Sequence, residues 1–232
     1  MENKRPSAFA PAVGNLYDLV YNDAEVREFI ELADQAMEAI GFTEHGVRHV
    51  GQVSETAGRI LRDLGRGDEE VQLARCAGLL HDIGNLVGRE DHTRSGALLS
   101  YAILTRLGFA PHQTGLIIGA IGSHEEEVEP PLNAICAAVI IADKVDVHRS
   151  RVRKYSPEIH DIHDDVNYAC VESSLAVDKE KKLITLELTI DLEIATVMEY
   201  FQIFSTRMMI TRIASEYLGC AFHLIVNGTK LA

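Results

Sequence analysis

Several common signatures of catalysis are missing from this sequence. Its cysteines are far apart and show no C-x-x-C spacing, so we expect neither a disulfide framework nor a thiolate zinc site. There is no G-x-S-x-G motif and no P-loop, which argues against that type of serine nucleophile and against a nucleoside triphosphatase. The cysteines lie in apolar surroundings, which is typical of buried side chains in a reducing compartment: Cys76, Cys136, Cys170 and Cys220.

Positive charge is also scarce. The chain of 232 residues has 22 Lys and Arg against 35 Asp and Glu, which gives a formal net charge of -13. Such a balance opposes the counterion release that drives binding to nucleic acids, and it disfavours adsorption to anionic membranes. We therefore expect neither a nucleic-acid polymer nor a membrane as a partner.

Long hydrophobic runs are absent as well. The longest apolar stretch, 134–142, is too short to span a bilayer. The N-terminal segment MENKRPSAFAPAVG lacks the apolar core of a signal peptide. A soluble, cytoplasmic protein is expected, and its 47% hydrophobic residues suffice for a substantial core.

The sequence does contain strong helical periodicity up to about residue 155. Apolar residues recur at helical spacing, and glycines follow at the expected ends. Residues 1–21 show no clear period and are expected to form an irregular arm. Helices are expected over 22–41, over 43–64, from Asp68 to Leu80, and over 93–107, 111–123 and 130–150.

The period changes to two in the last third of the chain. Apolar and polar residues alternate over 184–190, and the polar turn DKEKK joins this strand to an earlier one near 166–177. A long helix over about 192–218 and a short strand, AFHLIVNG, complete the pattern. The fold is therefore predicted to be mainly α, with a small α+β appendage of three antiparallel strands and one long helix. The predicted domains are 1–155 and 156–232.

The motif AGLLHDIGN places His81 and Asp82 side by side at the end of a predicted helix. Neighbouring residues on a helix point about 100° apart, so both reach one cation only if it lies against the helix end. An imidazole and a carboxylate suit a hard or borderline divalent cation, which needs further ligands from elsewhere. Asp143 is one candidate, because an isolated carboxylate after the run AICAAVIIA is costly to bury unpaired. His45 is another.

Two more histidines, His92 and His124, lie at expected helix ends. If they face the same cavity, six groups could hold two ions, with one carboxylate as a bridge. His49, one turn after His45, is interpreted as an ordinary hydrogen-bonded or solvated side chain. The six candidate ligands are His45, His81, Asp82, His92, His124 and Asp143.

These residues and their order resemble the HD-domain superfamily of metal-dependent phosphohydrolases. The resemblance rests on a His, then His-Asp in LLHDIGN, then Asp in IADKVD, and it covers about residues 23–155. It implies an HD-domain helical bundle in which one metal is bound by His45, His81, Asp82 and Asp143.

In two-metal members of the superfamily, further histidines bind the second ion, and the resemblance gives this role to His92 and His124. The expected cofactors are thus one or two divalent ions, from among Mn, Fe, Mg, Ni, Co and Zn. Glu125 stands where many two-metal members have a second His, and no G-Y-P follows His124. The cyclic-dinucleotide phosphodiesterase branch is therefore not indicated.

Basic residues follow Asp143 in the segment DKVDVHRSRVRK, and Arg94 follows His92. One interpretation is a basic helix end that complements the helix macrodipole. The other is recognition of a phosphate group on the substrate. The candidates for phosphate binding are Lys144, Arg94, Arg149, Arg151 and Arg153.

The resulting functional hypothesis is a metal-dependent phosphohydrolase, with His81 and Asp82 at its catalytic centre. A metal-activated water would cleave a phosphate ester of a small molecule, with nucleotides among the candidates. Two alternatives stay open: an HD-type di-iron oxygenase, and a catalytically silent regulatory protein that binds a nucleotide. The appendage would wall the pocket or form the contact of a homodimer.

Overall fold

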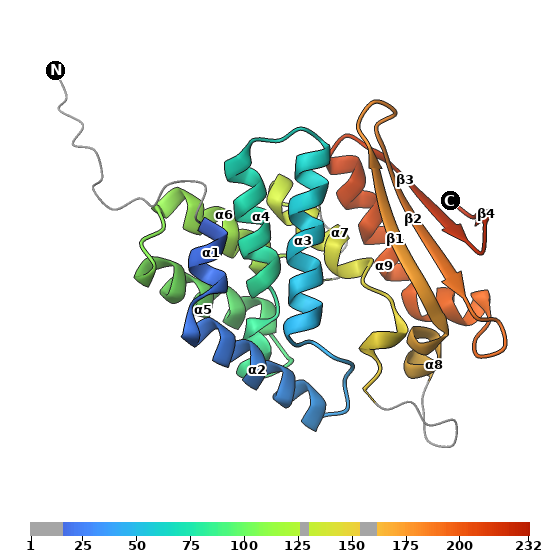
Figure 1. Ribbon diagram of the computed structural model, residues 1–232, viewed down its shortest axis with the longest axis horizontal. Coiled ribbons are helices and arrows are strands. Elements are labelled where there is room, and N and C mark those ends of the chain that lie inside the picture. The colour runs from blue at the N-terminus through green and yellow to red at the C-terminus, as the bar shows by residue number, and fades with distance from the viewer. Residues whose placement is uncertain (1–15, 126–129, 154–161) are drawn as a thin grey trace.

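The computed structural model describes residues 16–125, 130–153 and 162–232 (Figure 1). The helices are α1 (Leu16–Tyr21), α2 (Ala24–Ala39), α3 (Val47–Asp63), α4 (Asp68–Leu80), α5 (His92–Arg106), α6 (Pro111–Gly122), α7 (Ala134–Lys144), α8 (Ile162–Ala169) and α9 (Val197–Tyr217), with the short 3-10 helices η2 (Ile83–Leu86) and η3 (Arg149–Arg151). The strands are β1 (Cys170–Asp178), β2 (Leu183–Ile190), β3 (Ala221–Val226) and β4 (Thr229–Lys230).

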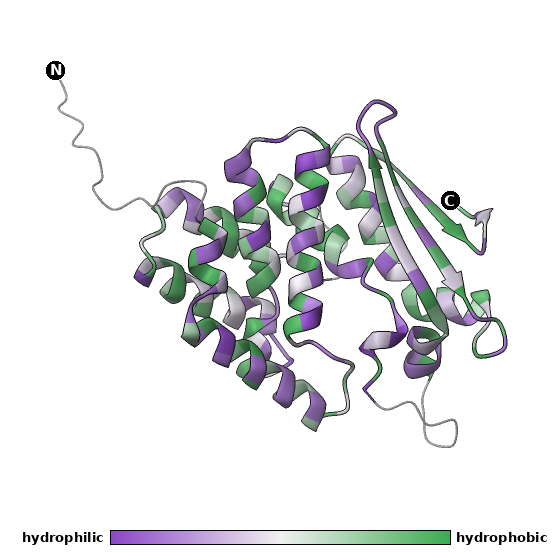
Figure 2. Cartoon of the chain, in the orientation of Figure 1, coloured by the Kyte–Doolittle hydropathy of each residue, from purple (hydrophilic) through white to green (hydrophobic). Residues whose placement is uncertain are grey.

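Helices α3, α4 and α7 pack against one another at the centre of the bundle. The side chain of Asn133 caps α7 by accepting a hydrogen bond from the Cys136 amide, and every residue of 135–144 is buried. Figure 2 shows hydrophilic residues along α2 and hydrophobic ones among the central helices. Gly78 permits a close approach of α4 to α3, because a Cβ there would lie 2.8 Å from Cα of Ser54. The apolar run of α7 is thus the middle of the core.

The C-terminal sheet differs from the prediction in its strand number and direction. Its order is β1-β2-β3-β4, with β1 antiparallel to β2 and β3 antiparallel to β4. Strands β2 and β3 are parallel, pairing Leu183 with Ala221 and Leu188 with Val226. The physical reason is α9, which returns the chain along the sheet so that β3 starts at the same end as β2. The prediction of three antiparallel strands was therefore wrong, although a mainly helical fold with a small α+β appendage is confirmed.

One hydrophobic core joins the bundle and the appendage. Helix α9 packs on α7, and both contribute to the same cluster of buried apolar residues. Arg59 of α3 also donates a hydrogen bond of 2.7 Å to the carbonyl of Leu175 in β1. The predicted boundary between residues 155 and 156 lies outside the described residues, so the division into two domains stays a prediction.

Two short helices were not predicted. Helix α1 lies in the segment expected to be irregular, and it buries Leu16, Tyr17 and Val20. Helix α8 precedes β1, which begins at Cys170 rather than near residue 166. Both are stabilised by packing rather than by length, since isolated helices of this size are marginal in water. Within the described residues, we find no helix with the length and apolarity needed to cross a bilayer.

Candidate metal centre

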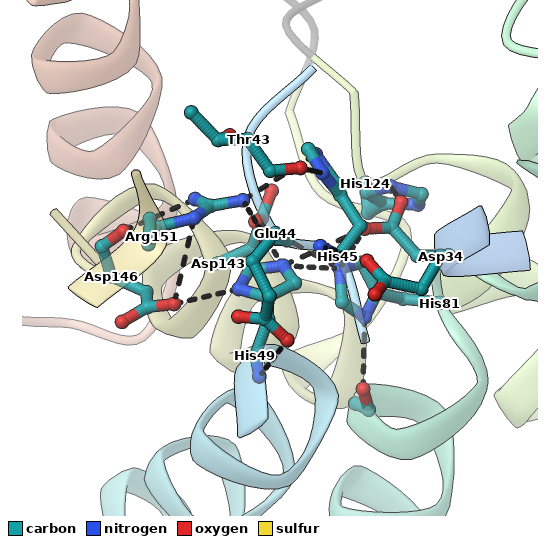
Figure 3. A network of polar contacts seen from close by, with 12 residues as sticks. Asp34, Thr43, Glu44, His45, His49, His81, His124, Asp143, Asp146 and Arg151 are labelled. Carbon is teal, nitrogen blue, oxygen red and sulfur yellow. Dashed lines mark hydrogen bonds and ion pairs between the residues drawn. The ribbon is translucent and has the colours of Figure 1, made fainter. Parts of the chain in front are cut away.

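Six buried side chains with metal-binding atoms meet at the ends of helices in the bundle. His49 lies in the first turn of α3, and Asp143 lies in the last turn of α7. The others come from the end of α4, the start of α5 and the residues after α6. Figure 3 shows several of them pointing toward one another. The six are His49, His81, Asp82, His92, His124 and Asp143.

The first group of ligand atoms surrounds one oxygen of Asp82. Its Oδ2 lies 3.3 Å from Nε2 of His81 and 3.5 Å from Nε2 of His49. The two histidine Nε2 atoms are 3.3 Å apart. Oδ1 of Asp143 is 3.4 Å from His49 Nε2 and 3.8 Å from His81 Nε2. We call these four residues the inner group.

The second group surrounds the other oxygen of Asp82. Its Oδ1 lies 3.4 Å from Nε2 of His92 and 3.8 Å from Nε2 of His124. The two Nε2 atoms are 3.3 Å apart. Oε1 of Glu125 lies 3.3 Å from His92 Nε2 at the edge of this set. We call Asp82, His92 and His124 the outer group, and the Asp82 carboxylate belongs to both groups.

Gly84 explains how α5 comes so close to Asp82. A Cβ at Gly84 would lie 1.9 Å from the carbonyl oxygen of His92, so only glycine fits there. The glycine of the HDIG motif therefore has a packing role: it lets η2 touch the start of α5. That contact brings His92 beside Asp82.

A hydrogen bond on Nδ1 fixes each histidine ring of the two groups and turns its Nε2 inward. His81 bonds to the carbonyl of Gly78 at 2.8 Å, and His124 bonds to that of Ile121 at 2.7 Å. His92 bonds to the carbonyl of Arg89 at 3.1 Å. A carbonyl accepts only from an Nδ1–H, so Nδ1 is the protonated nitrogen of each ring in its neutral form, and Nε2 is the nitrogen that faces the centre.

His49 is oriented by a carboxylate instead. Its Nδ1 lies 2.7 Å from Oδ2 of Asp146, and Figure 3 shows this contact beside Arg151. Arg48 reaches the same carboxylate with two N–H groups, at 3.1 and 3.3 Å. Burial raises the pKa of Asp146, but His49 and Arg151 outweigh this effect and hold the pKa well below its ordinary value. Asp146 is therefore an ionised acceptor for His49.

The protonation states differ within the two groups. Burial and Arg151 lower the pKa of His49, but its hydrogen bonds to Asp143, Asp146 and Asp82 outweigh them and raise this pKa to about 10. Burial disfavours ionised Asp82, yet His81 and His49 hold its pKa well below the ordinary value. Burial acts likewise on Asp143, and Lys144 is the main group that lowers the pKa of Asp143. Burial lowers the pKa of His124 to about 3, so its ring is neutral. Metals bind ionised carboxylates and neutral imidazole nitrogens, so a cation would have to displace the proton that the carboxylates hold on His49.

The donor atoms fit divalent cations in number, type and spacing. Ligands at about 2.1 Å from a metal lie roughly 3.0 to 3.4 Å from one another, close to the spacings in both groups. Within the part of the chain that the structure describes, three sets of three residues have their ligand atoms within 4.8 Å of one another, and each set includes His81 or Asp82. Nitrogen and carboxylate oxygen donors without thiolates favour Mn, Fe, Co, Ni, Zn or Mg over soft ions. The centre could therefore hold one or two such cations.

The structure brings together five of the six predicted ligands and places the sixth, His45, beside them. Nδ1 of His45 contacts the carbonyl of Thr43 at 2.6 Å, and its Nε2 faces Arg151 at 3.4 Å. His49 occupies the position that the sequence analysis gave to His45. The physical reason is where α3 starts: Gly46 is its N-cap, so His45 lies in the preceding loop while His49 is on the helix. His49 was interpreted as hydrogen-bonded or solvated: the structure shows it hydrogen-bonded and buried, with its Nε2 among the ligand atoms. Which of the two histidines binds a cation stays a prediction.

The predicted phosphate-binding residues do not share one place. Lys144 is buried at the centre, with its Nζ 2.8 Å from Oδ2 of Asp143. Arg153 binds Asp34, and Arg151 is buried against the backbone carbonyls of Asp146 and Glu44. These two arginines stabilise the loop before α3.

Arg149 and Arg94 are also placed away from the ligand atoms. Arg149 packs over the ring of Tyr168, 5.0 Å from its centroid. Arg94 is largely exposed and pairs with Asp91 at 2.8 Å, although it lines the cleft described next.

A polar cleft of about 400 Å³ leads to the outer group and is lined by His92 and Glu125. Arg89 also lines it, with Nη2 2.9 Å from Oε1 of Glu125 and Nη1 3.2 Å from Nε2 of His92. The sequence analysis did not select Arg89. Arg89 lies in the loop that precedes α5, and no pattern in the sequence marks it.

One family model, one solved structure and several curated proteins are similar to parts of this chain. A family model described as HD domain matches residues 46–149, so the match begins after His45 and includes His49. Among solved structures, a predicted HD superfamily hydrolase from an uncultured Thermotogales bacterium is 26% identical, with a TM-score of 0.44. That match covers 58% of this chain and 75% of the other.

Several curated proteins share part of the sequence. Ribonuclease Y of an Aster yellows witches'-broom phytoplasma is 33% identical over 119 residues, 51% of this chain and 21% of that protein. Ribonuclease Y of Nitratidesulfovibrio vulgaris is 33% identical over 129 residues, 55% of this chain and 23% of that protein. The chain thus spans about a fifth of the length of these relatives. An uncharacterized protein of Methanocaldococcus jannaschii is 24% identical over 201 residues, with 77% of each chain covered.

Proposed function

Residues 46–149 of this chain belong to the HD domain family, and on that premise we propose that the protein is a metal-dependent phosphohydrolase. The observation that carries the proposal is the Asp82 carboxylate, which presents one oxygen to the inner group and the other to the outer group. A carboxylate shared in this way is the arrangement expected of a bridge between two cations. The reaction is hydrolysis of a phosphate ester of a small molecule.

Different residues of the chain have different roles in this proposal. When bound, divalent cations would neutralise phosphoryl oxygens. They would also lower the pKa of water, so that hydroxide is available to attack phosphorus at neutral pH. The Nδ1 hydrogen bonds hold the four imidazoles in place before the substrate arrives. Arg89 supplies positive charge beside the outer group, suited to the non-bridging oxygens of a phosphate, whereas Lys144 is buried against Asp143 of the inner group.

A small substrate agrees with the size and charge of the cleft. Its volume of about 400 Å³ lies within the range typical of sites for metabolites and nucleotides. The relatives named ribonuclease Y raise RNA as an alternative substrate class. The net charge of -13 speaks against a long polyanion, since it opposes electrostatic attraction along the surface.

The test is elemental analysis of the purified protein, followed by a hydrolysis panel with Mn, Mg, Co, Ni, Zn and Fe. The panel contains phosphomonoesters, nucleotides, cyclic nucleotides and a short RNA. Asp82→Ala should lose bound metal and turnover together, because Asp82 serves both groups. Asp63→Ala is the matched control, since Asp63 is an exposed residue at the end of α3.

Three outcomes would contradict the proposal. One is full metal content and activity in Asp82→Ala. Another is that the protein cleaves RNA but hydrolyses no small phosphate ester, which would make RNA the substrate class. The third is a visible absorption band of iron in aerobically purified protein without any phosphate release, which would favour oxygen chemistry.

A further inference from the structure

A second cavity, of about 410 Å³, lies between α3 and β1. Arg48, Arg59 and Thr56 of α3 line one side, and Ser173 and Ser174 of β1 line the other. It shares no lining residue with the cleft at His92. We call it the α3–β1 cavity. Its size suits a small metabolite.

The two arginines of the cavity differ in their carboxylate partners. Arg48 is paired with both Glu44, at 2.8 Å, and Asp146, at 3.1 Å. Arg59 uses one N–H for the carbonyl of Leu175, and it has no carboxylate partner among the residues that the structure describes. A guanidinium offers five N–H donors, so most of those of Arg59 remain for a ligand. Asp146 is the one carboxylate among the lining residues, and it already accepts from Arg48 and His49.

Backbone and side-chain donors complete the set. Strand β1 is at the edge of the sheet, and the Leu175 carbonyl points away from β2 toward Arg59. In an antiparallel strand the N–H of a residue points to the same side as its C=O, so the Leu175 amide also faces α3. Gln52 and Ser174 add an amide and a hydroxyl to the lining. Arginine forks with nearby neutral donors are a typical environment for phosphate oxygens.

Asp146 links this cavity to the metal centre. Its carboxylate lines the cavity, receives Arg48 at 3.1 and 3.3 Å, and lies 2.7 Å from Nδ1 of His49. If a bound anion takes over hydrogen bonds of Arg48, the Asp146 carboxylate accepts the hydrogen bond from Nδ1 of His49 more strongly. A stronger bond at Nδ1 makes Nε2 of His49 a better metal ligand. The negative charge of the ligand acts in the same direction, because it attracts the cations.

We propose that the α3–β1 cavity binds a small phosphate-bearing anion through Arg48 and Arg59, and that this binding strengthens cation binding at the metal centre. The second half rests on the proposed function, since it requires that His49 hold a cation. Linkage is reciprocal, so the cation strengthens binding of the anion by the same factor. The cavity is then a regulatory site for the hydrolase.

The first experiment locates the anion. Inorganic phosphate is titrated into the full-length, metal-loaded, isotope-labelled chain, and amide shifts are followed by NMR. We expect shifts at Ser173, Ser174 and Leu175, separate from any at the cleft. Arg59→Gln, which keeps a donor for Leu175, should weaken the affinity reported by these shifts about tenfold, while Arg62→Gln, an exposed arginine on the same helix, should not.

Unchanged affinity at these amides in Arg59→Gln, or shifts confined to the cleft around His92, would overturn the site. This result does not depend on hydrolysis, so failure of the proposed function would leave it intact. Thermal unfolding of both variants checks that Arg59→Gln still folds.

The second experiment measures the coupling. Free Mn²⁺ is quantified by electron paramagnetic resonance, with sulfate as the anion because it binds Mn²⁺ weakly, and with chloride at equal ionic strength as the control. Sulfate should tighten Mn²⁺ binding about fivefold in the natural chain and in Arg62→Gln. Arg59→Gln should show no such change. An equal effect of sulfate in Arg59→Gln would overturn the coupling, even if the anion binds in the cavity.

Discussion

The inner and outer groups share Asp82 but have different surroundings. In the inner group, Asp143 is paired with buried Lys144, and His49 is held by Asp146 behind it. The outer group opens onto the cleft, where Glu125 is 36% exposed and Arg89 is 31% exposed. From this difference we expect the inner group to hold a cation more tightly and the outer group to contact the substrate.

The largest expected effect comes from the choice between His49 and His45. His49→Gln should lower metal affinity and turnover by more than about 100-fold. This exceeds the 10- to 100-fold loss of affinity or activity that is typical when a residue only orients a ligand. His45→Gln should retain metal and most activity, because its Nε2 faces Arg151 and not the ligand atoms. Metal analysis and initial rates of hydrolysis measure these effects in both variants. If His45→Gln lost metal and His49→Gln did not, the inner group would be wrongly composed.

Asp146→Asn should have the next largest effect, and only on the inner group. The amide keeps the size of the side chain but removes the charge that orients and polarises His49. Metal affinity should fall about 10- to 100-fold, as expected for a partner behind a ligand. Two binding steps measured by calorimetry would separate the groups: the tighter step should weaken while the other stays. A loss confined to the weaker step would reverse the comparison.

Arg89→Gln should act on the outer group alone. It removes the positive charge beside His92 and Glu125 at the cleft, while the ligand atoms stay in place. We expect KM to rise about tenfold with kcat changed much less, since a charge-assisted contact to the substrate is lost. Arg94→Gln is the control at the same cleft, because Arg94 is exposed and pairs with Asp91. Equal changes in both variants would mean that the cleft attracts anions only by its overall charge.

The sequence could reveal most of the metal centre because its residues break local rules. His81 and Asp82 sit at a helix end before a glycine, and Asp143 ends an apolar run, so each is conspicuous without a structure. The choice between His45 and His49 could not be made in this way. The two are four residues apart, and which one faces the other ligand atoms depends on Gly46 being the N-cap of α3. The start of a helix can be predicted from sequence only to within a few residues. That uncertainty is as large as the separation between His45 and His49.

Roles that depend on distant partners were also beyond the sequence. Arg153 looked suited to phosphate because it follows the ligand segment, yet it binds Asp34, 119 residues earlier in the chain. The parallel pairing of β2 with β3 did have a signal, since a strand, a long helix and a strand form a crossover. The alternating pattern of the strands alone carries no information about direction.

The smallest predicted effect concerns the loop that leads into the inner group. Asp34 accepts hydrogen bonds from Arg153 and from the His45 amide. Burial raises the pKa of Asp34, but Arg153 and the amide outweigh it and lower the pKa below its ordinary value. Its stabilisation is therefore present above the unfolded pKa of about 3.9 and is lost as the pH falls through the lower, folded pKa.

Asp34→Asn should accordingly lower the free energy of unfolding by about 1 kcal/mol at neutral pH, a value reduced by the partial exposure of the pair. The difference from the natural chain should shrink as the pH falls below about 4. Urea unfolding at several pH values measures it, with Asp63→Asn as an exposed control. Metal content should stay unchanged, since Asp34 holds the loop and not the ligands. Loss of metal in Asp34→Asn would mean that the inner group depends on this loop. Residues 42–46 would then have to be counted with the inner group rather than with its surroundings.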